Sequence, residues 1–308
     1  MSVVLDSTVD ALDRAAALMS LDAQRWRVED THHGAESTGL ADALYERWFT
    51  EAAEPVARAT TDPPLHHRTL LGPLRAAHEG AARLTPGWVV TKVNPSGGVA
   101  VMRSGQPRWA ASGDYLLRTH PGVPAAPGEP AELTARRDEL DADRGLWWTL
   151  SDPEPQAAIG RVYFNARAAT VPRVVHEITC ALDGFAFKMK CPIYPEAYRR
   201  VDAVVLYHDR DTREPLLAAL TEKWTTLGPL LDPAVPPLTC LVHPGLAVAD
   251  ELGGDRSYGE SRCHMLAEAA MAERHEWNAM DTGSRREVLI AGMRSAGMSL
   301  AEPWRQTP

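Results

Sequence analysis

The hydrophobic pattern is most regular between residues 159 and 207. Apolar and polar side chains alternate over residues 161–165, which is typical of a half-buried strand. Apolar residues then recur at helical spacing over residues 171–182, with a proline near the start and a glycine just after the end. Alternation returns over residues 185–190, and a further apolar run covers residues 201–207. The pattern predicts a strand, a helix and two more strands, in that order.

The chain before this segment has two kinds of pattern. Helical spacing dominates the front and predicts helices over residues 1–20, 40–53 and 70–84. From Gly87 onward, short alternating runs are separated by glycine, proline and serine, which indicates an antiparallel meander. The expected strands cover residues 88–93, 99–103, 115–119 and 146–150, with a charged helix over residues 132–144 before the last of them.

Capping signatures mark the helices near the C-terminus. Ser257 and Glu260 have the spacing of a capping box, so a helix should begin there and reach about His275. Ser284 and Glu287 repeat the signature for a last helix. The stretch between the central segment and Ser257 predicts a helix over residues 212–227 and a short strand over residues 238–242.

These elements predict an α+β protein. We expect a helical N-terminal part over residues 1–86, followed by a domain over residues 87–308. In that domain, helices should flank a mixed, mainly antiparallel sheet.

Charge changes this picture at one place. The chain has a formal net charge of -9, but residues 188–200 hold two lysines and two arginines against one acid, Glu196. A strand that buries one face can carry Lys188 and Lys190 on the other face only if that face meets water, a partner charge or a ligand. An anionic ligand would explain the local excess of positive charge.

Composition excludes several classes of protein. The acidic balance argues against a general nucleic-acid binder, which would usually have a basic domain. No apolar run approaches the roughly 20 residues that span a bilayer, so we expect no membrane partner. Acids at Asp6, Asp10 and Asp13 interrupt the stretch where a signal peptide would be apolar. We therefore expect a cytoplasmic protein.

The cysteines carry no metal-binding signature. Cys180, Cys191, Cys240 and Cys263 are widely spaced, and none forms a C-x-x-C pair. Nothing in their spacing supports a zinc site that includes His264. Buried free thiols are the expected state, because cysteine is among the most buried residue types.

The candidate site consists of charged and phenolic residues from the central segment and the following helix: Arg161, Tyr163, Lys188, Lys190, Arg200, Asp202, Tyr207 and Arg262. Arginine forks suit phosphate, because two parallel charge-assisted hydrogen bonds give both energy and orientation. A partly desolvated lysine near other cations can act as a base, and a neighbouring tyrosine could donate a proton. The alternative is that the arginines are surface ion-pair partners of acids such as Asp202 and Glu196, which is the commoner role.

Several of these residues fall in short motifs that follow one another along the chain. The motifs are Arg161-Val162-Tyr163-Phe164-Asn165, Phe187-Lys188, Tyr198-x-Arg200-x-Asp202-x-x-Val205-Leu206-Tyr207, Pro244-Gly245-Leu246 and Ser257-Tyr258-Gly259-x-x-Arg262. Together they resemble a known family, the domain named after the HopA type III effectors, over roughly residues 145–275. That domain also occurs in biosynthetic clusters for class V lanthipeptides and thioviridamide-like peptides.

The resemblance implies a fold and a reaction. The family is thought to be distantly similar to phosphothreonine lyases and to the lyase domains of class III lanthipeptide synthetases, so a phosphothreonine-lyase-like core is expected. Those enzymes eliminate phosphate from phosphothreonine or phosphoserine and leave dehydrobutyrine or dehydroalanine. The lysine of their Phe-Lys motif takes the α-proton, which implies that role for Lys188. Their first motif, Lys-x-His-x-Ser, supplies a histidine as general acid where this chain has Tyr163. The alternatives are that His243 is the acid, or that a leaving phosphate surrounded by arginines needs little protonation.

The other candidates are assigned by the same resemblance and by charge. Arg200 and Arg262 would hold the phosphate, with Asp202 orienting an arginine. Lys190 or Arg161 would steady the enolate or the phosphate, with Tyr207 beside them. No metal or cofactor is expected.

Three functions remain open at this point. The first is a lyase that acts on a ribosomal precursor peptide after a kinase-like partner protein has phosphorylated it. The second is a non-catalytic protein that binds a phosphopeptide or a leader peptide, and the third is a type III effector. In the first two cases, the front helical part could bind the leader peptide or the partner.

Overall fold

The computed structural model describes residues 2–22, 24–29, 32–51, 69–78, 84–117, 124–134, 138–151, 155, 159–250 and 256–305. In these ranges the chain forms eight α-helices and three sheets, and the expected α+β class is confirmed. Every strand pair described within the sheets is antiparallel.

The front of the chain is helical, as expected, but it also contains a small sheet. The helices are α1 (Ser2–Leu18), α2 (Ser37–Leu44) with a π-helical turn at Tyr45–Phe49, and α3 (Leu71–Ala77). The sheet consists of β1 (Met19–Leu21), β2 (Trp26–Val28) and β3 (His32–Gly34). The sequence pattern did not reveal these strands because three residues are too few to establish alternation. Residues 79–83 of the expected third helix lie outside the described residues.

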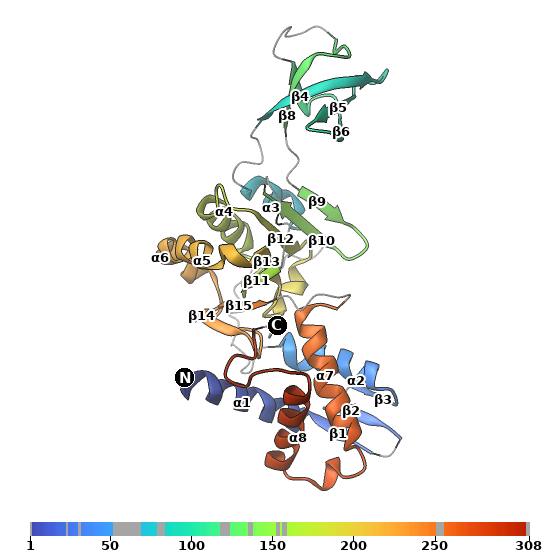
Figure 1. Ribbon diagram of the computed structural model, residues 1–308, viewed down its shortest axis with the longest axis vertical. Helices are drawn as coiled ribbons and strands as arrows, with labels where there is room; N and C mark the ends of the chain where they lie inside the picture. The colour runs from blue at the N-terminus through green and yellow to red at the C-terminus, as the bar shows by residue number, and fades with distance from the viewer. Residues whose placement is uncertain are drawn as a thin grey trace.

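The next part of the chain forms a five-stranded sheet with its own hydrophobic core. Figure 1 shows this sheet at one end of the molecule. Its order is β6-β5-β4-β8-β7. The strands are β4 (Leu84–Val93), β5 (Val99–Arg103), β6 (Gln106–Ala110), β7 (Tyr115–Leu117) and β8 (Pro130–Thr134). The boundary expected between residues 86 and 87 falls inside β4.

The charged helix expected over residues 132–144 is wrong. Its first residues belong to β8, and β9 (Asp138–Asp141) occupies its middle, while residues 135–137 lie outside the described part. Ala131 and Leu133 are buried opposite Trp88 and Thr85 of β4. Cross-strand pairing and burial of alternate side chains therefore outweigh the helix propensity of this acidic sequence.

The central sheet has seven strands in the order β14-β15-β11-β13-β12-β10-β9. Its remaining strands are β10 (Leu146–Leu150), β11 (Ile159–Phe164), β12 (Phe187–Pro192), β13 (Val204–Asp209), β14 (Cys240–His243) and β15 (Leu246–Asp250). The predicted strand, helix and strand are confirmed as β11, α4 (Val171–Ala181) and β12. The third strand, β13, inserts between β11 and β12, so these two strands are not neighbours.

The two faces of the central sheet differ in character. Val162, Leu206 and Met189 are direct partners across three strands, and all are fully buried in the same core as the apolar side of α4. The opposite face carries the residues that alternate with them. The single helix that the sequence predicts over residues 212–227 is divided at Lys223 into α5 (Arg213–Glu222) and α6 (Trp224–Leu227), which follow β13.

The C-terminal helices are α7 (Tyr258–Ala272) and α8 (Thr282–Ser295). The capping box at Ser257 and Glu260 is confirmed, with both of its hydrogen bonds present. The expected start of α8 at Ser284 is wrong, because Asp281 caps the helix and accepts a hydrogen bond from the Ser284 N–H at 2.7 Å.

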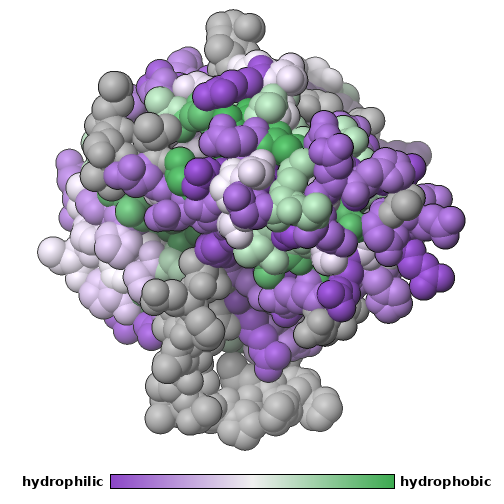
Figure 2. Space-filling model, turned by 90° about the horizontal axis from the view of Figure 1, so that it is seen from below, coloured by the Kyte–Doolittle hydropathy of each residue, from purple (hydrophilic) through white to green (hydrophobic). Residues whose placement is uncertain are grey.

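The front and the end of the chain share one hydrophobic core. Helix α1 contacts α8, and α2 contacts α7. Figure 1 shows these helices side by side below the central sheet, and Figure 2 shows that the surface at that end is mainly hydrophilic with small apolar patches. Among the described helices, none has both the length and the apolar character that crossing a membrane requires.

Candidate functional site

Three of the predicted site residues lie in one row across the central sheet. Arg161 of β11 and Lys188 of β12 are both direct partners of Tyr207 on β13. Residues directly opposite each other in a sheet point to the same face, so the three side chains leave the sheet together. The predicted alternation of β12 is confirmed, because Phe187 and Met189 are buried while Lys188 and Lys190 are half-buried.

Aromatic rings separate the two cations of this row. The Cζ atom of Arg161 lies 4.9 Å from the centre of the Tyr207 ring, and the Nζ atom of Lys188 lies 4.7 Å from the centre of the Trp148 ring. The two rings lie 5.8 Å apart. We refer to Arg161, Tyr207, Trp148 and Lys188 as the sheet-face cluster. Each cation thus has an aromatic partner of its own, at a distance typical of cation–π contacts.

The next row on the same face contains Tyr163 and Lys190. Tyr163 is the partner of Val205, which is the partner of Lys190, and Lys190 lies opposite Trp148 of β10. Tyr163 is 2% exposed, and its hydroxyl has no hydrogen-bond partner among the described residues. Burial raises the pKa of this phenol well above its usual value of 10, although the charge of Arg161 opposes the shift.

A second charged group lies at the Arg200 side chain. Its guanidinium donates hydrogen bonds to the Asp202 carboxylate at 2.8 and 2.9 Å and to the Tyr45 hydroxyl at 2.9 Å. The Tyr45 hydroxyl in turn donates to Asp202 at 3.0 Å. Burial alone would lower the pKa of Arg200, but the hydrogen bonds and charge of Asp202 outweigh it and raise the pKa. We refer to Arg200, Asp202 and Tyr45 as the Arg200 anchor.

Aromatic contacts connect the anchor to the central sheet. The Tyr45 ring stacks on Phe49, with 5.5 Å between ring centres. Phe49 meets the Tyr163 ring edge-on, with 6.5 Å between ring centres and 72° between the planes. Because Tyr163 projects from the same face as Lys188, the anchor and the sheet-face cluster lie on one side of the sheet.

Arg262 meets the same aromatic group through Tyr258, whose ring centre lies 6.2 Å from that of Phe49, but its side chain is enclosed. Its side chain is 4% exposed and lies against the Tyr258 ring, 4.7 Å from Cζ to the ring centre. Its Nη2 atom donates to the Pro303 carbonyl at 2.9 Å, and the Tyr258 hydroxyl donates to the same carbonyl. These contacts attach the C-terminal segment to α7. Arg262 is therefore enclosed, whereas Arg200 is partly open to solvent.

The alternative acid, His243, is remote from Lys188. It lies on β14, four strand spacings from β12, which corresponds to about 19 Å. Its ring stacks on Trp224, with 4.2 Å between ring centres. The geometry gives His243 a packing role.

No metal site accompanies these residues in the part of the chain that the structure describes. Within it, no three histidine, cysteine or acidic side chains gather as potential metal ligands. None of the four cysteines, all of which lie within the described residues, forms a disulfide; Cys191 and Cys263 are buried, while Cys180 and Cys240 are partly exposed.

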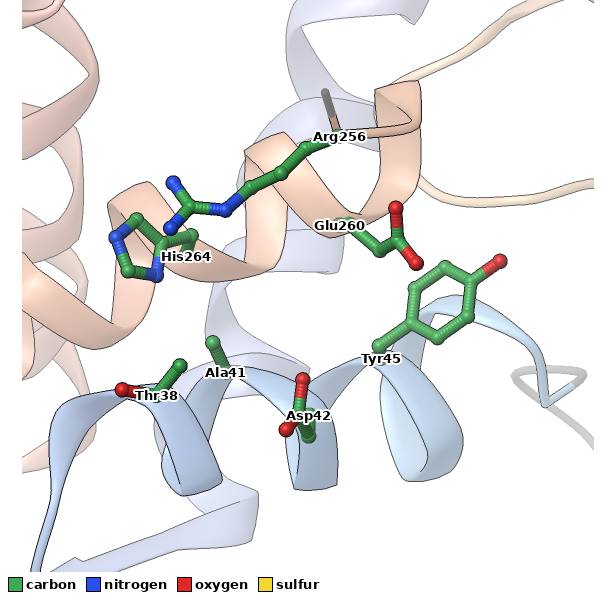
Figure 3. A pocket seen from close by; sticks show the side chains of 7 residues that line it. All are labelled: Thr38, Ala41, Asp42, Tyr45, Arg256, Glu260 and His264. Atoms are coloured by element: carbon green, nitrogen blue, oxygen red, sulfur yellow. The ribbon is translucent and has the colours of Figure 1, made fainter. Parts of the chain in front are cut away.

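A pocket of about 220 Å³ opens beside the anchor, between α2 and the start of α7. Figure 3 shows Thr38, Ala41, Asp42 and Tyr45 on one wall, and Arg256, Glu260 and His264 on the other. Tyr45 belongs both to this pocket and to the anchor. The pocket is large enough for an amino-acid side chain.

Two residues of this arrangement were not among the sequence candidates. Tyr45 pairs with Asp202 across 157 positions of the sequence. Trp148 falls in a strand that the sequence predicted. Alternation of apolar and polar residues predicts which face of the sheet a side chain occupies, but it does not predict which residues of other strands lie beside it. Both contacts depend on the order of elements in space.

Comparison with known proteins gives a family for the chain. The model of the HopA1 effector protein family matches residues 147–305, just over half of the 308 residues. None of the curated proteins compared with the sequence matches it significantly.

Two similar solved structures are effector proteins from Pseudomonas syringae, one from pv. tomato strain DC3000 and one from pv. syringae strain 61. They are 17% and 16% identical to this chain, each with a TM-score of 0.42. Each similarity covers 55% of this chain and 66% of the effector chain, which is slightly less than two thirds. On the family match, this chain belongs to the HopA1 effector protein family.

Proposed function

We propose that the protein is a phosphothreonine or phosphoserine lyase that acts on a phosphorylated precursor peptide. The observation that carries the proposal is the row of Arg161, Tyr207 and Lys188 across the central sheet, with the Arg200 anchor on the same side. It brings a candidate base and candidate phosphate ligands to one face of the molecule.

The chemistry explains why a base and several cations belong together. In β-elimination, Lys188 takes the α-proton, and the electrons of the Cα–H bond pass to the neighbouring carbonyl as an enolate. When the enolate collapses, those electrons form the Cα–Cβ double bond as the Cβ–O bond breaks, and the electrons of the Cβ–O bond leave with the phosphate. Negative charge develops on the neighbouring carbonyl and on the leaving group, and fixed positive charge stabilises both. Lysine and arginine side chains supply these needs, and the step itself calls for no cofactor.

The residues proposed to bind phosphate are assigned from the orientation of their side chains. Asp202 holds the Arg200 guanidinium by two hydrogen bonds and thus fixes the direction of its remaining donors. Arg161 and Lys190 come from adjacent strand rows and would steady the phosphate or the enolate. Arg262 donates to Pro303 and would support the fold instead.

Geometry favours Tyr207 over Tyr163 as the general acid. Tyr163 is enclosed, and burial raises the pKa of its phenol, which makes it a poor proton donor. Tyr207 is half-buried and lies between Arg161 and Lys188. Arg161 is 6% exposed and lies over the Tyr207 ring, so its charge would favour a leaving phosphate beside Tyr207.

The peptide and its kinase-like partner protein are inferred from the resemblance to lanthipeptide and thioviridamide-like biosynthesis. The pocket between α2 and α7 gives the peptide a place to lie beside the anchor. The helical front of the chain, which forms one wall of that pocket, could also bind the leader peptide.

One observation favours a second candidate, a non-catalytic phosphopeptide-binding protein. Lys188 lies against the Trp148 ring, a contact that a charged ammonium group makes favourably. A lysine that stays charged would take no proton, so the site would bind phosphate without eliminating it. Membership of an effector family is compatible with either activity.

Mass spectrometry of intact peptide separates the two candidates. A phosphothreonine peptide is incubated with the protein alone, and its mass is followed with time. A lyase gives the mass loss of phosphoric acid, whereas a phosphatase gives loss of phosphate with gain of water. An unchanged mass together with measurable binding would support the binding protein and contradict the lyase.

A further inference from the structure

We propose that Trp148 is a positioning residue that keeps the Lys188 amine away from the bound phosphate. The inference rests on the proposed lyase function, because it assigns Trp148 a role toward the proposed base. Trp148 touches neither of the reacting bonds in this proposal and acts only through Lys188.

The site has a physical problem that such a residue solves. A phosphate dianion attracts every flexible cation near it, and lysine is a compact charge on a long, mobile stem. An amine drawn into an ion pair with the phosphate would point away from the α-carbon. A lysine base in a phosphate site therefore needs a competing contact that holds it to one side.

The Trp148 ring supplies that contact. The Lys188 Nζ atom lies 4.7 Å from its centre. The ring is itself fixed, because Tyr207 packs against it at 5.8 Å and Arg161 covers Tyr207 at 4.9 Å. Cation–π attraction is strengthened when the partners are partly desolvated, and both Trp148 and Lys188 are half-buried.

Lys190 offers an internal comparison. It lies directly opposite Trp148 on the same sheet face as Lys188. Among the described cation–π contacts, Trp148 holds Lys188 and not Lys190. The two lysines therefore have different roles in this proposal. Lys188 is held at the Trp148 ring, and Lys190 can contact the phosphate.

The test compares binding with turnover in substituted proteins. Trp148→Leu and Trp148→Met remove the ring, Trp148→Phe keeps one, and Trp109→Leu is the control at an exposed tryptophan of β6. Circular dichroism and thermal unfolding select the variants that fold. For each, the affinity for a phosphothreonine peptide and the rate constant of elimination are measured.

We expect Trp148→Leu to bind the phosphopeptide about threefold more tightly, because the released lysine gains an ion pair with phosphate. Its elimination rate constant should fall at least tenfold, because the amine no longer points at the α-carbon. Trp148→Phe and Trp109→Leu should stay close to wild type in both. A purely structural role for Trp148 would instead weaken binding and lower the rate together, and that result overturns the proposal, as does an unchanged affinity and rate.

A protein with both Trp148→Leu and Lys188→Ala gives a test that uses phosphopeptide affinity alone and needs no catalysis. If the gain in affinity comes from Lys188, Trp148→Leu should have no effect on affinity in the Lys188→Ala protein. The same gain in that background would contradict the proposal. If no protein eliminates phosphate, the lyase function fails, and the affinity pattern alone still decides whether Trp148 controls Lys188.

Discussion

The guanidinium of Arg200 and the carboxylate of Asp202 form a two-point hydrogen-bonded pair, at 2.8 and 2.9 Å. Asp202 is 5% exposed, while the Arg200 side chain reaches the surface. A buried acid thus orients a more exposed arginine, an arrangement that suits an anion-binding group better than a surface ion pair. The remaining guanidinium donors can then face a ligand at little entropic cost.

Replacing Asp202 should weaken phosphate binding through Arg200. In Asp202→Ala we expect the affinity for a phosphothreonine peptide to fall about tenfold, because Arg200 loses its fixed orientation. Loss of the hydrogen bonds should also lower the free energy of unfolding by about 1 kcal/mol. Calorimetric titration and urea unfolding measure the two effects, with Asp211→Ala as a control at an exposed acid. If Asp202→Ala bound the peptide with the affinity of wild type, the Arg200 anchor would not be part of the phosphate site.

The two tyrosines of the sheet face should respond differently to loss of the hydroxyl. Tyr207→Phe should lower the rate constant of elimination by a factor of about 100, the smaller end of typical general-acid contributions. Tyr163→Phe should keep the rate within about twofold and should not destabilise the fold, because its buried hydroxyl has no partner among the described residues. Single-turnover assays give the rates. The opposite ranking would return the acid role to Tyr163.

Arg262→Ala and Arg200→Ala should differ in their effect on phosphopeptide affinity. Arg262→Ala should lower the free energy of unfolding by about 2 kcal/mol, through lost packing and the lost hydrogen bond to Pro303. Phosphopeptide affinity of the folded protein should stay within about twofold. Arg200→Ala should instead weaken phosphopeptide binding strongly, and it should also lower the free energy of unfolding, because it leaves the buried Asp202 carboxylate without its arginine. Arg294→Ala on the exposed side of α8 should do neither. Strongly weakened binding in folded Arg262→Ala would place Arg262 in the phosphate site.

His208 should make the fold sensitive to mild acid. Its side chain is fully buried, and its Nδ1–H donates to the Asp209 carbonyl at 2.7 Å. Burial lowers the pKa of His208 below its usual value of 6.5, and the charge of Arg213 adds to this effect. The unfolded chain therefore binds a proton at a higher pH than the folded protein does. Stability should be complete above about pH 6.5 and should fall as the pH drops below it.

Urea unfolding at pH 7.5 and at pH 5.5 checks this effect. His208→Gln should show a smaller difference in unfolding free energy between the two pH values than wild type does. Equal differences in the two proteins would mean that another group causes the acid sensitivity.

Local patterns were sufficient for much of the central fold. Alternation assigned Lys188 and Lys190 to the face opposite Phe187 and Met189, and helical spacing located α4. The capping box at Ser257 located the start of α7. Each of these features depends on residues that are close in the sequence.

Features that depend on distant pairing were not predictable in this way. β13 lies between β11 and β12, which makes Tyr207 the neighbour of both Arg161 and Lys188. Nothing in the spacing of these strands fixes that order. β15 also escaped prediction, because all five of its residues are buried and it therefore lacks alternation.

From the sequence, Arg262 was a phosphate-binding candidate like the other cations. Its charge suggested phosphate binding, but charge alone does not determine where a side chain points. In the fold, the Pro303 carbonyl and the Tyr258 ring enclose it. A buried arginine and an exposed one look alike in a sequence motif.

The most direct test of the lyase proposal is the Lys188→Arg protein. Arginine keeps the positive charge but does not accept a proton at neutral pH, so it separates binding from base catalysis. The measurement is the intact mass of a phosphothreonine peptide after incubation with saturating protein. We predict that Lys188→Arg binds the peptide within about threefold of wild type and produces no loss of phosphoric acid, while wild type converts the peptide fully. Elimination by Lys188→Arg at a rate near that of wild type would contradict the assignment of Lys188 as the base.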